Sequence, residues 1–251
     1  MIETFNFTSI TLVTDNYEGV TIDNSTMPNI LEDFEKEIVN ILDNLEDKKL
    51  LWIKLPIIKS DFIPILTKYD FVFHHCNEED ITLLKKLSMN SIIPTARNHT
   101  LGVGVVVINQ DNQILLIQDR IGKRYKLPGG YIDNHENIST AAVREVKEET
   151  GIDVEFTSII ALGHFKPLQF GESNLYVGCT AKAFSREIHI IDNYEIIEAR
   201  WMDLDEFLDH EEVLTFNKTM VKTAIKNHGL RFEHIDMFKD RAINIDYELF
   251  F

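Results

Sequence analysis

Three carboxylates in one segment have the spacing of a metal site. Glu145, Glu148 and Glu149 occupy positions i, i+3 and i+4 of a pattern that predicts a helix over residues 139–150. At about 100° per residue, their side chains share one arc of the helix surface. Like charges this close repel one another unless a cation lies between them. Hard divalent cations such as Mg²⁺ prefer oxygen ligands, so the spacing predicts a divalent-metal site.

Other positions of this helix predict how it is placed. Val146 points away from the carboxylates and is expected to pack the helix onto a sheet. Arg144 precedes Glu148 by one turn and is expected to orient it through a charge-assisted hydrogen bond. Ala141, one turn before Glu145, is expected to leave space over the carboxylates. A row of acids is also typical of a solvated helix face, so the surrounding sequence has to decide.

The surrounding sequence follows a longer pattern. A glycine is followed by five residues, a glutamate, seven more residues, and then Arg-Glu-aliphatic-x-Glu-Glu-x-Gly-aliphatic. The positions are filled by Gly130, Glu136, Arg144, Glu145, Val146, Glu148, Glu149, Gly151 and Ile152. So many fixed residues make a chance match negligible. The segment resembles the catalytic box of the Nudix hydrolase superfamily.

This resemblance implies a fold, a reaction and a set of residue roles. The fold would be an α/β/α sandwich with a mixed sheet, and the reaction cleavage of a diphosphate linked to a nucleoside. Attack on phosphorus would come from a water activated by Mg²⁺ or Mn²⁺. The implied metal ligands are Glu145, Glu148, Glu149 and the carbonyl of Gly130. Glu136 and Arg144 would be mainly structural and orienting residues.

A second resemblance covers residues from about 50 to 210. The segment from Leu51 to Cys76 is similar to the pre-Nudix domain that precedes the catalytic domain in one animal and plant Nudix group. HTLGVGVVVINQ, ILLIQDR, FGESNLY and RWMDLDEF, further along the chain, are also similar to that group. The resemblance implies a small α+β domain with an acetyltransferase-like fold, from which acetyl transfer is not expected. It also implies ADP-ribose or NADH as substrate.

Several residues outside the box are candidates for the substrate site. Pro167 lies sixteen residues after Gly151, a position that the resemblance associates with ADP-ribose hydrolases, although an ordinary loop proline is the alternative. The resemblance also suggests Glu195 as a base or extra metal ligand; the alternative is a solvated loop acid. We expect phosphate or base contacts from Arg120, Arg124, Lys126, Phe170 and Tyr176. The alternative for the basic residues is a solvated hairpin edge. The chain lacks the four cysteines of the zinc-binding NADH pyrophosphatases, which excludes that subfamily.

Hydrophobic periodicity predicts the elements that position these residues. The first part is predicted as an α+β unit, with a helix over about 28–47, a strand over 70–76 and a helical turn or two over 78–86. The polar connector around Pro94 predicts a boundary, giving domains 1–95 and 96–251. In the second domain, 102–108 and 114–117 are expected to form a hairpin. Gly151 is expected to end the box helix.

Composition and charge limit the classes of function. Asp and Glu total 41 against 25 Lys and Arg, a net charge of -16, which disfavours nucleic acid as a partner. Two cysteines suggest a reducing compartment, and no run reaches the roughly 18 apolar residues of a membrane span. We therefore expect a cytoplasmic protein without a membrane partner. The aromatic carboxyl-terminal residues are expected to pack on their own domain or on a second subunit, and we expect a homodimer.

Two alternatives to the substrate prediction stay open. A different diphosphate, such as a nucleoside triphosphate, FAD or CoA, is the alternative within the enzyme class. A ligand sensor or protein-interaction module on the Nudix fold is the alternative outside it, although such modules typically have eroded boxes and this one is intact.

Overall fold

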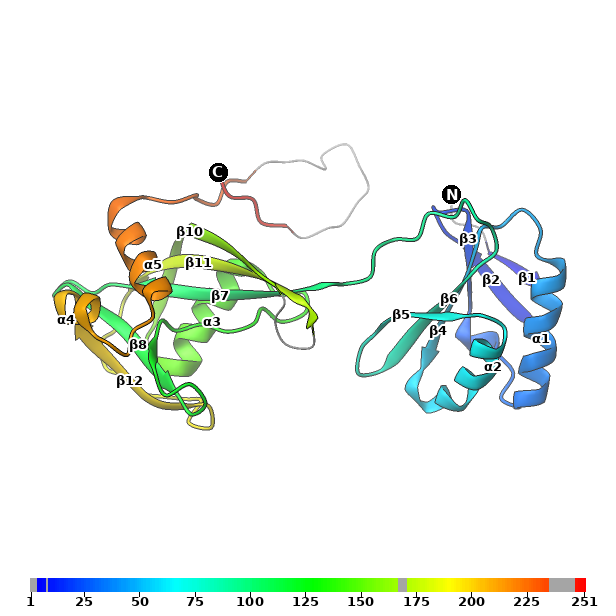
Figure 1. The fold of residues 1–251 in the computed structure, drawn as a ribbon, viewed down its shortest axis with the longest axis horizontal. Coiled ribbons are helices and arrows are strands. Elements are labelled where there is room, and N and C mark those ends of the chain that lie inside the picture. Colours follow the sequence, from blue (N-terminus) through cyan, green and yellow to red (C-terminus); the bar gives the residue numbers. More distant parts are fainter. Residues whose placement is uncertain (1–3, 8, 167–170, 235–246) are drawn as a thin grey trace. The chain divides into compact units, whose positions relative to one another are not determined.

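The computed structural model describes residues 4–7, 9–166, 171–234 and 247–251. Its backbone contacts divide the chain into two compact units, Met1–Arg97 and Asn98–Phe251 (Figure 1). Each unit has its own sheets and its own buried cores. That the units fold independently as domains 1–95 and 96–251 stays a prediction. Among the described residues, no helix is long and apolar enough to cross a membrane.

The first unit is an α+β structure built on one six-stranded sheet. Its strands are β1 (Thr4–Phe7), β2 (Ile10–Thr14), β3 (Gly19–Ile22), β4 (Leu50–Pro56), β5 (Val72–Cys76) and β6 (Asp80–Lys86), in the order β1-β2-β3-β4-β6-β5. Only β3 and β4 pair in parallel among these described strands. The helices are α1 (Leu31–Asn44) and α2 (Ile63–Lys68), with short 3-10 turns η1 (Asn24–Thr26) and η2 (Ile57–Phe62).

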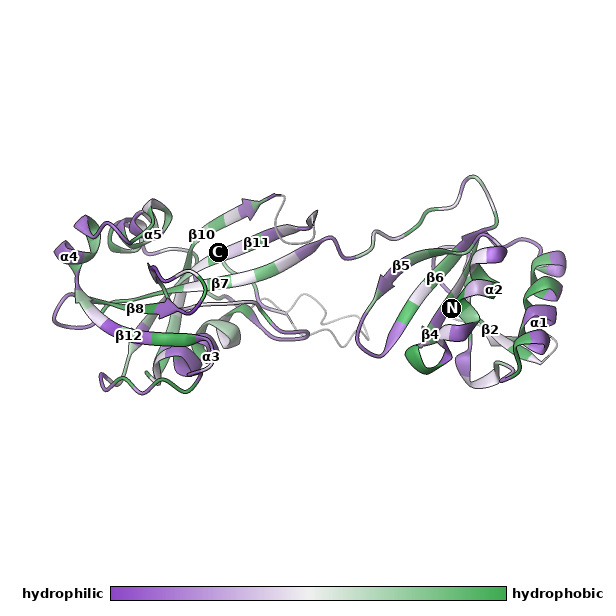
Figure 2. Cartoon of the chain, turned by 60° about the horizontal axis from the view of Figure 1, so that its bottom comes forward, coloured by the Kyte–Doolittle hydropathy of each residue, from purple (hydrophilic) through white to green (hydrophobic). Residues whose placement is uncertain are grey.

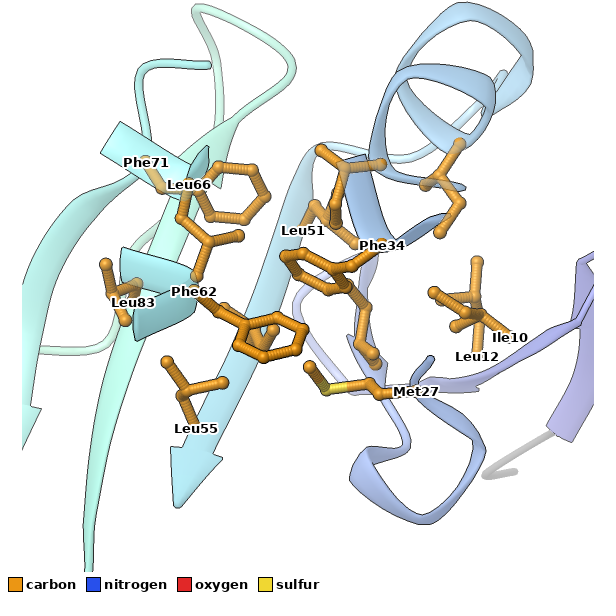
Figure 3. Close-up of a cluster of buried hydrophobic side chains, with 14 of the residues drawn as sticks. Ile10, Leu12, Met27, Phe34, Leu51, Leu55, Phe62, Leu66, Phe71 and Leu83 are labelled. Atoms are coloured by element: carbon orange, nitrogen blue, oxygen red, sulfur yellow. The ribbon is translucent and has the colours of Figure 1, made fainter. Parts of the chain in front are cut away.

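Helix α1 supplies much of the core of this unit. Phe34, Ile38 and Ile41 recur at helical spacing and are fully buried. The ring of Phe34 meets that of Phe62 edge-on, with centroids 4.7 Å apart (Figure 3). The ribbon of α1 changes between hydrophilic and hydrophobic along its length, as this spacing requires (Figure 2). Burying each large apolar side chain contributes roughly 1.5–3 kcal/mol, so this helix face anchors the unit.

The prediction of a helical turn over 78–86 is wrong, because this segment forms strand β6. β6 pairs with β4 on one side and β5 on the other. Leu83 lies in the core beneath α1, while Leu84 packs with Trp52 on the opposite face of the sheet. Adjacent leucines buried on opposite faces are typical of a central strand, and the charged ends of the segment concealed it.

The second unit contains two three-stranded sheets. The strands are β7 (His99–Val107), β8 (Gln113–Asp119), β9 (Tyr125–Lys126), β10 (Val154–Phe165), β11 (Ser173–Ala183) and β12 (Ile196–Asp203). One sheet has the order β10-β11-β7, with β11 and β7 parallel, and the other has the order β12-β8-β9. The helices are α3 (Ile138–Thr150), α4 (Leu204–Asp209) and α5 (Thr215–Lys226). Mixed strand directions and helices agree with the predicted α/β fold class.

The predicted hairpin is present only next to the tight turn between β7 and β8, where Ile108 and Ile114 form a single antiparallel bridge. The Asn109 side chain accepts hydrogen bonds from the amides of Asp111 and Gln113 in that turn. Beyond it the strands separate, β7 pairing with β11 and β8 with β12 and β9. Each strand contains a continuous apolar run, and this run is buried in a different sheet in the two cases. The remaining edge of β7 is therefore available to the glycine-rich loop of the box.

The carboxyl-terminal residues pack on their own unit. The ring of Phe250 lies 5.7 Å from that of Phe156 on β10 and 6.2 Å from that of Phe232. Glu248 accepts a hydrogen bond of 3.3 Å from the amide of Ser139 in the first turn of α3. The sequence left a choice between the same domain and a second subunit, and the described residues 247–251 use the former.

Candidate active site

The three glutamates of helix α3 lie at different depths. Glu149 is only 4% exposed, and the side chain of Glu145 is 12% exposed. The side chain of Glu148 is 47% exposed. The helix packs through fully buried Val146, as predicted, and ends at Gly151, whose φ of 74° is the left-handed conformation expected of a stop glycine. Ala141 is also fully buried, so the prediction that it opens space over the carboxylates is wrong.

Two glycines bring the loop before α3 against these carboxylates. The amide of Gly129 donates a hydrogen bond of 2.8 Å to Oε2 of Glu149. A Cβ at Gly129 would lie 2.1 Å from the carbonyl oxygen of Val103, and one at Gly130 would lie 2.7 Å from Oε1 of Glu145. The Gly130 carbonyl accepts a hydrogen bond of 2.8 Å from the amide of Val103, which fixes the loop to the edge of β7. Only glycine fits at position 129, whereas a Cβ at position 130 would displace the Glu145 carboxylate.

Arg144 joins the acids of the box into one network. Its Nε and one terminal nitrogen donate to the two oxygens of Glu136, at 2.7 and 2.8 Å. Its other terminal nitrogen donates to Glu145 at 2.9 Å and to Glu148 at 3.1 Å. The predicted contact from Arg144 to Glu148 is confirmed, and Glu136 is held as a structural partner would be. The Arg144 hydrogen bonds lower the pKa of Glu136, and in return Glu136 raises the pKa of Arg144.

Burial disfavours the charged forms of two of the box carboxylates, Glu145 and Glu149. Burial raises the pKa of Glu149 to about 8, although the Gly129 amide and the charge of Lys126 oppose that rise. Burial also raises the pKa of Glu145, and Arg144 opposes the rise. The negative charge of Glu195 adds to both increases, which places Glu195 within electrostatic range of the box. This corner of the unit is therefore short of positive charge.

The donor chemistry fits a hard divalent cation. Within the described ranges, no three His, Cys, Asp or Glu side chains converge closely enough to hold a metal ion as they stand. Instead, Arg144 bridges Glu145 and Glu148, and Glu149 is bound to the Gly129 amide. All three side chains offer carboxylate oxygens as ligands, and a cation would stabilise the charged forms of the two buried acids, whose pKa values are raised mainly by burial. The residues therefore suit the predicted metal.

The predicted basic residues have different surroundings. Lys126 pairs with Asp119 at 2.8 Å and lies near Glu149, whose pKa it lowers. Arg124 is exposed. The guanidinium of Arg120 donates to the backbone carbonyls of Asn193 and Tyr194.

An aromatic pocket of 380 Å³ opens beside the glycine loop. Its wall includes Gly129, Gly130 and Lys126 together with the rings of Phe165 and Tyr176 and that of Phe216 from α5. The Tyr176 and Phe216 centroids are 5.5 Å apart, and those of Phe165 and Phe216 are 5.6 Å apart. Tyr176, which the sequence predicts as a substrate contact, therefore lines this pocket. Pro167 and Phe170 lie outside the described residues.

Sequence reasoning missed several residues of this pocket, among them Phe216, Asn174 and Asn217. Phe216 shares a helical face with buried Met220, four residues later, so its spacing indicates only a core position. Asn174 and Asn217 are buried polar side chains, which no local pattern distinguishes from surface asparagines.

Comparison with known proteins places this site in a family. A family model described as NUDIX domain matches residues 98–223, and one described as Nudix hydrolase domain matches residues 10–87. Nudix hydrolase 8 of Arabidopsis thaliana is 35% identical over 229 residues, covering 88% of this chain and 61% of that protein. Nucleoside diphosphate-linked moiety X motif 6 of Xenopus laevis is 34% identical over 185 residues, covering 71% of this chain and 85% of that protein.

A solved structure matches about half of the chain. The MutT NUDIX hydrolase from Burkholderia pseudomallei is 25% identical, covers 51% of this chain and 98% of its own, and has a TM-score of 0.44. The chain spans about three fifths of the Arabidopsis relative, 61%, so it corresponds to part of that longer protein. The family model matches the unit that holds the glutamate helix and the aromatic pocket, and a second Nudix model matches the unit before it. The chain belongs to the Nudix hydrolase family.

Proposed function

We propose that this protein hydrolyses a nucleoside diphosphate linked to another moiety, with ADP-ribose or NADH as the substrate and AMP as a product. The observation that carries the proposal is the aromatic pocket beside Gly129 and Gly130, whose other neighbours are the carboxylates of α3. A flat ring in the pocket would leave the attached diphosphate next to these acids. The name of the Xenopus relative likewise describes a nucleoside diphosphate joined to a second moiety.

The residues of the box would bind and orient the reacting groups. Glu145, Glu148, Glu149 and the Gly130 carbonyl would hold Mg²⁺ or Mn²⁺, since all are oxygen donors. When bound, such a cation lowers the pKa of water and neutralises charge on phosphoryl oxygens. Glu195, whose charge reaches Glu145 and Glu149, would accept the proton of the attacking water.

Basic residues would compensate the charge of the substrate. Lys126 lines the aromatic pocket and lies near Glu149. Its ammonium group, which pairs with Asp119, would lie between the ring and the diphosphate of the substrate. Arg124 is exposed and would contact the outer phosphate. These cations suit an anionic substrate in a protein whose net charge is -16.

We expect Phe216→Ala to weaken substrate binding. Its ring forms one wall of the pocket and contacts those of Phe165 and Tyr176. Losing one aromatic contact should raise KM about tenfold and leave kcat within about twofold. Steady-state kinetics would measure both constants. The matched control is Phe184→Ala, because Phe184 is 64% exposed and does not line this pocket. An unchanged KM in Phe216→Ala would contradict the proposal that a ring of the substrate binds in this pocket.

A substrate panel tests the reaction itself. The purified chain would be incubated with ADP-ribose, NADH, a nucleoside triphosphate, FAD and CoA in the presence of Mg²⁺ or Mn²⁺. Product chromatography should show AMP and ribose 5-phosphate from ADP-ribose, because water adds at one phosphorus and the other phosphate leaves. If only a triphosphate, FAD or CoA were consumed, that compound would be the substrate in place of ADP-ribose or NADH. Ligand binding without turnover would favour a ligand sensor.

We also propose a cytoplasmic homodimer of two-domain chains, divided near residue 95. Exposed apolar side chains such as Ile121, Ile191 and Ile197 support association, although Phe250 is already packed against Phe156. A two-fold arrangement is the simplest closed assembly. Light scattering at micromolar concentration should give about twice the chain mass of 29.1 kDa. A mass of 29.1 kDa would show a monomer.

A further inference from the structure

The loop that carries Glu195 is attached to the end of helix α3. The amide of His189 donates to the carbonyl of Thr150 at 2.9 Å. The amides of Ile191 and Asp192 both donate to the carbonyl of Glu148, at 3.0 and 2.8 Å. These hydrogen bonds therefore attach the first part of the loop to the last turn of the helix that carries the box carboxylates.

The loop is also braced from within. One carboxylate oxygen of Asp192 accepts hydrogen bonds from the amides of Tyr194 and Glu195, each at 3.1 Å. The next amide, that of Ile196, donates to the Asp192 carbonyl at 3.1 Å. Ile196 is fully packed and begins β12, where it pairs with Asp119. These bonds hold both ends of the loop but do not involve the carbonyls of its tip, residues 193–195.

Arg120 supplies donors to three successive carbonyls of the loop tip. Its Nε donates to the carbonyl of Tyr194 at 2.7 Å, and a terminal nitrogen donates to that of Asn193 at 2.8 Å. Its backbone amide donates to the carbonyl of Glu195 at 3.0 Å. A planar guanidinium can bind two neighbouring carbonyls at once, which a lysine ammonium cannot do with the same geometry.

We propose that Arg120 is a positioning residue that holds Glu195 toward Glu145 and Glu149. This inference rests on the proposed function, in which Glu195 accepts a proton. Arg120 lies in the turn directly after β8, whose residues 114–117 are fully buried, so its backbone is held close to the packed part of that strand. The observed partners of its side chain are backbone carbonyls of the loop, and its effect on the reaction passes through the position of Glu195.

A double-mutant cycle distinguishes this role from a direct contact with substrate. The variants are Arg120→Gln, Glu195→Gln and the two combined, with ADP-ribose as the probe. We expect Arg120→Gln to lower kcat about tenfold with KM within about twofold, since misplaced catalytic groups lose rate and not binding. In the Glu195→Gln background the same change should cost no further rate, because residues that act as one unit are not additive. Arg120→Lys should recover part of the loss.

The control and a second readout separate positioning from general damage. Arg186→Gln removes a surface arginine that pairs with Asp111 in the same unit, and it should leave kcat unchanged. Hydrogen exchange of Arg120→Gln should be about tenfold faster at the amides of Tyr194 and Glu195 than in the wild type, with the amides of α3 unchanged.

Each remaining outcome overturns the inference. A raised KM, or a loss in Arg120→Gln that adds fully to that of Glu195→Gln, would show a direct substrate contact. Full activity in Glu195→Gln, or unchanged exchange at Tyr194 and Glu195, would remove the link between the two residues. Absence of any turnover by the wild-type chain would instead show that the proposed function itself fails, and the inference with it.

Discussion

The Glu149→Gln variant is expected to keep its fold and to lose about a thousandfold in kcat, which corresponds to about 4 kcal/mol of transition-state stabilisation. Glutamine has nearly the same size, so the buried position stays filled and can still accept the hydrogen bond from Gly129. It has no negative charge to bind a divalent cation. Steady-state turnover of ADP-ribose measures the loss, and circular dichroism measures the fold.

The matched control for this variant is Glu155→Gln. Glu155 is an exposed residue of β10, so the same chemical change there should leave turnover as in the wild type. Turnover near the wild-type value in correctly folded Glu149→Gln would remove Glu149 from the catalytic machinery.

The same substitution has an expected signature in the dependence of stability on pH. The pKa of Glu149 is raised by burial from an ordinary 4.5 to about 8, so the metal-free folded protein holds a proton that the unfolded chain releases. The stability from this neutral form is therefore present below pH 4.5 and is lost as the pH rises toward 8. A metal ion competes with that proton, so metal should stabilise the protein more as the pH rises.

Thermal unfolding with EDTA and with Mn²⁺ would show this effect. The melting temperature of the metal-free wild type should fall relative to that of Glu149→Gln as the pH rises from about 5 to about 8. Added Mn²⁺ should raise the melting temperature of the wild type only. Parallel pH curves for the two proteins would show that Glu149 ionises normally.

The Arg144→Gln variant is expected to lose about 3 kcal/mol of the free energy of unfolding. Arg144 donates to Glu136 and Glu145, whose side chains are only 11% and 12% exposed. Removing the cation leaves these acids poorly solvated and unpaired, which is among the most destabilising changes in proteins. Denaturant unfolding at neutral pH measures the loss. Arg200→Gln, which removes an exposed pair with Glu206, should cost less than about 1 kcal/mol.

The destabilisation should depend on pH with a definite sign. Arg144 lowers the pKa of Glu136, so their interaction stabilises the folded protein above the ordinary glutamate pKa. This stabilisation is lost as the pH falls below the ordinary value and through the lowered pKa of Glu136 in the folded protein. The difference between wild type and Arg144→Gln should therefore shrink at acid pH. Adding Glu136→Gln to Arg144→Gln should restore part of the stability, because no buried charge is then left at that position. A pH-independent difference would mean that packing, and not charge, explains the loss.

Local spacing predicted the helix that carries the three glutamates. Glu145, Glu148 and Glu149 are three and four residues apart, so helix geometry alone places them together, and Gly151 ends the helix as expected. The family model over residues 98–223 confirmed the resemblance drawn from the box. The contact of Arg144 with Glu148 follows from the same local geometry.

Features that depend on distant parts of the chain were not predictable in this way. The separation of β7 from β8 depends on pairing with β11 and β12, and β6 is a strand because β4 and β5 flank it. Phe216 reaches the pocket because of the packing of α5. Arg120 meets its loop carbonyls across more than seventy residues of sequence. Adjacent residues of a helix do not face each other, yet Arg144 binds its neighbour Glu145. The contact is possible because Glu136 holds the guanidinium in that position.

The most direct test of the account is the metal dependence of ADP-ribose cleavage. Product chromatography would follow the purified chain with Mg²⁺ or Mn²⁺, then with excess EDTA, and then after metal is restored. The account predicts AMP and ribose 5-phosphate with metal, no product with EDTA and recovery on restoration. Equal turnover in excess EDTA, or no cleavage of ADP-ribose or NADH with either metal, would contradict it.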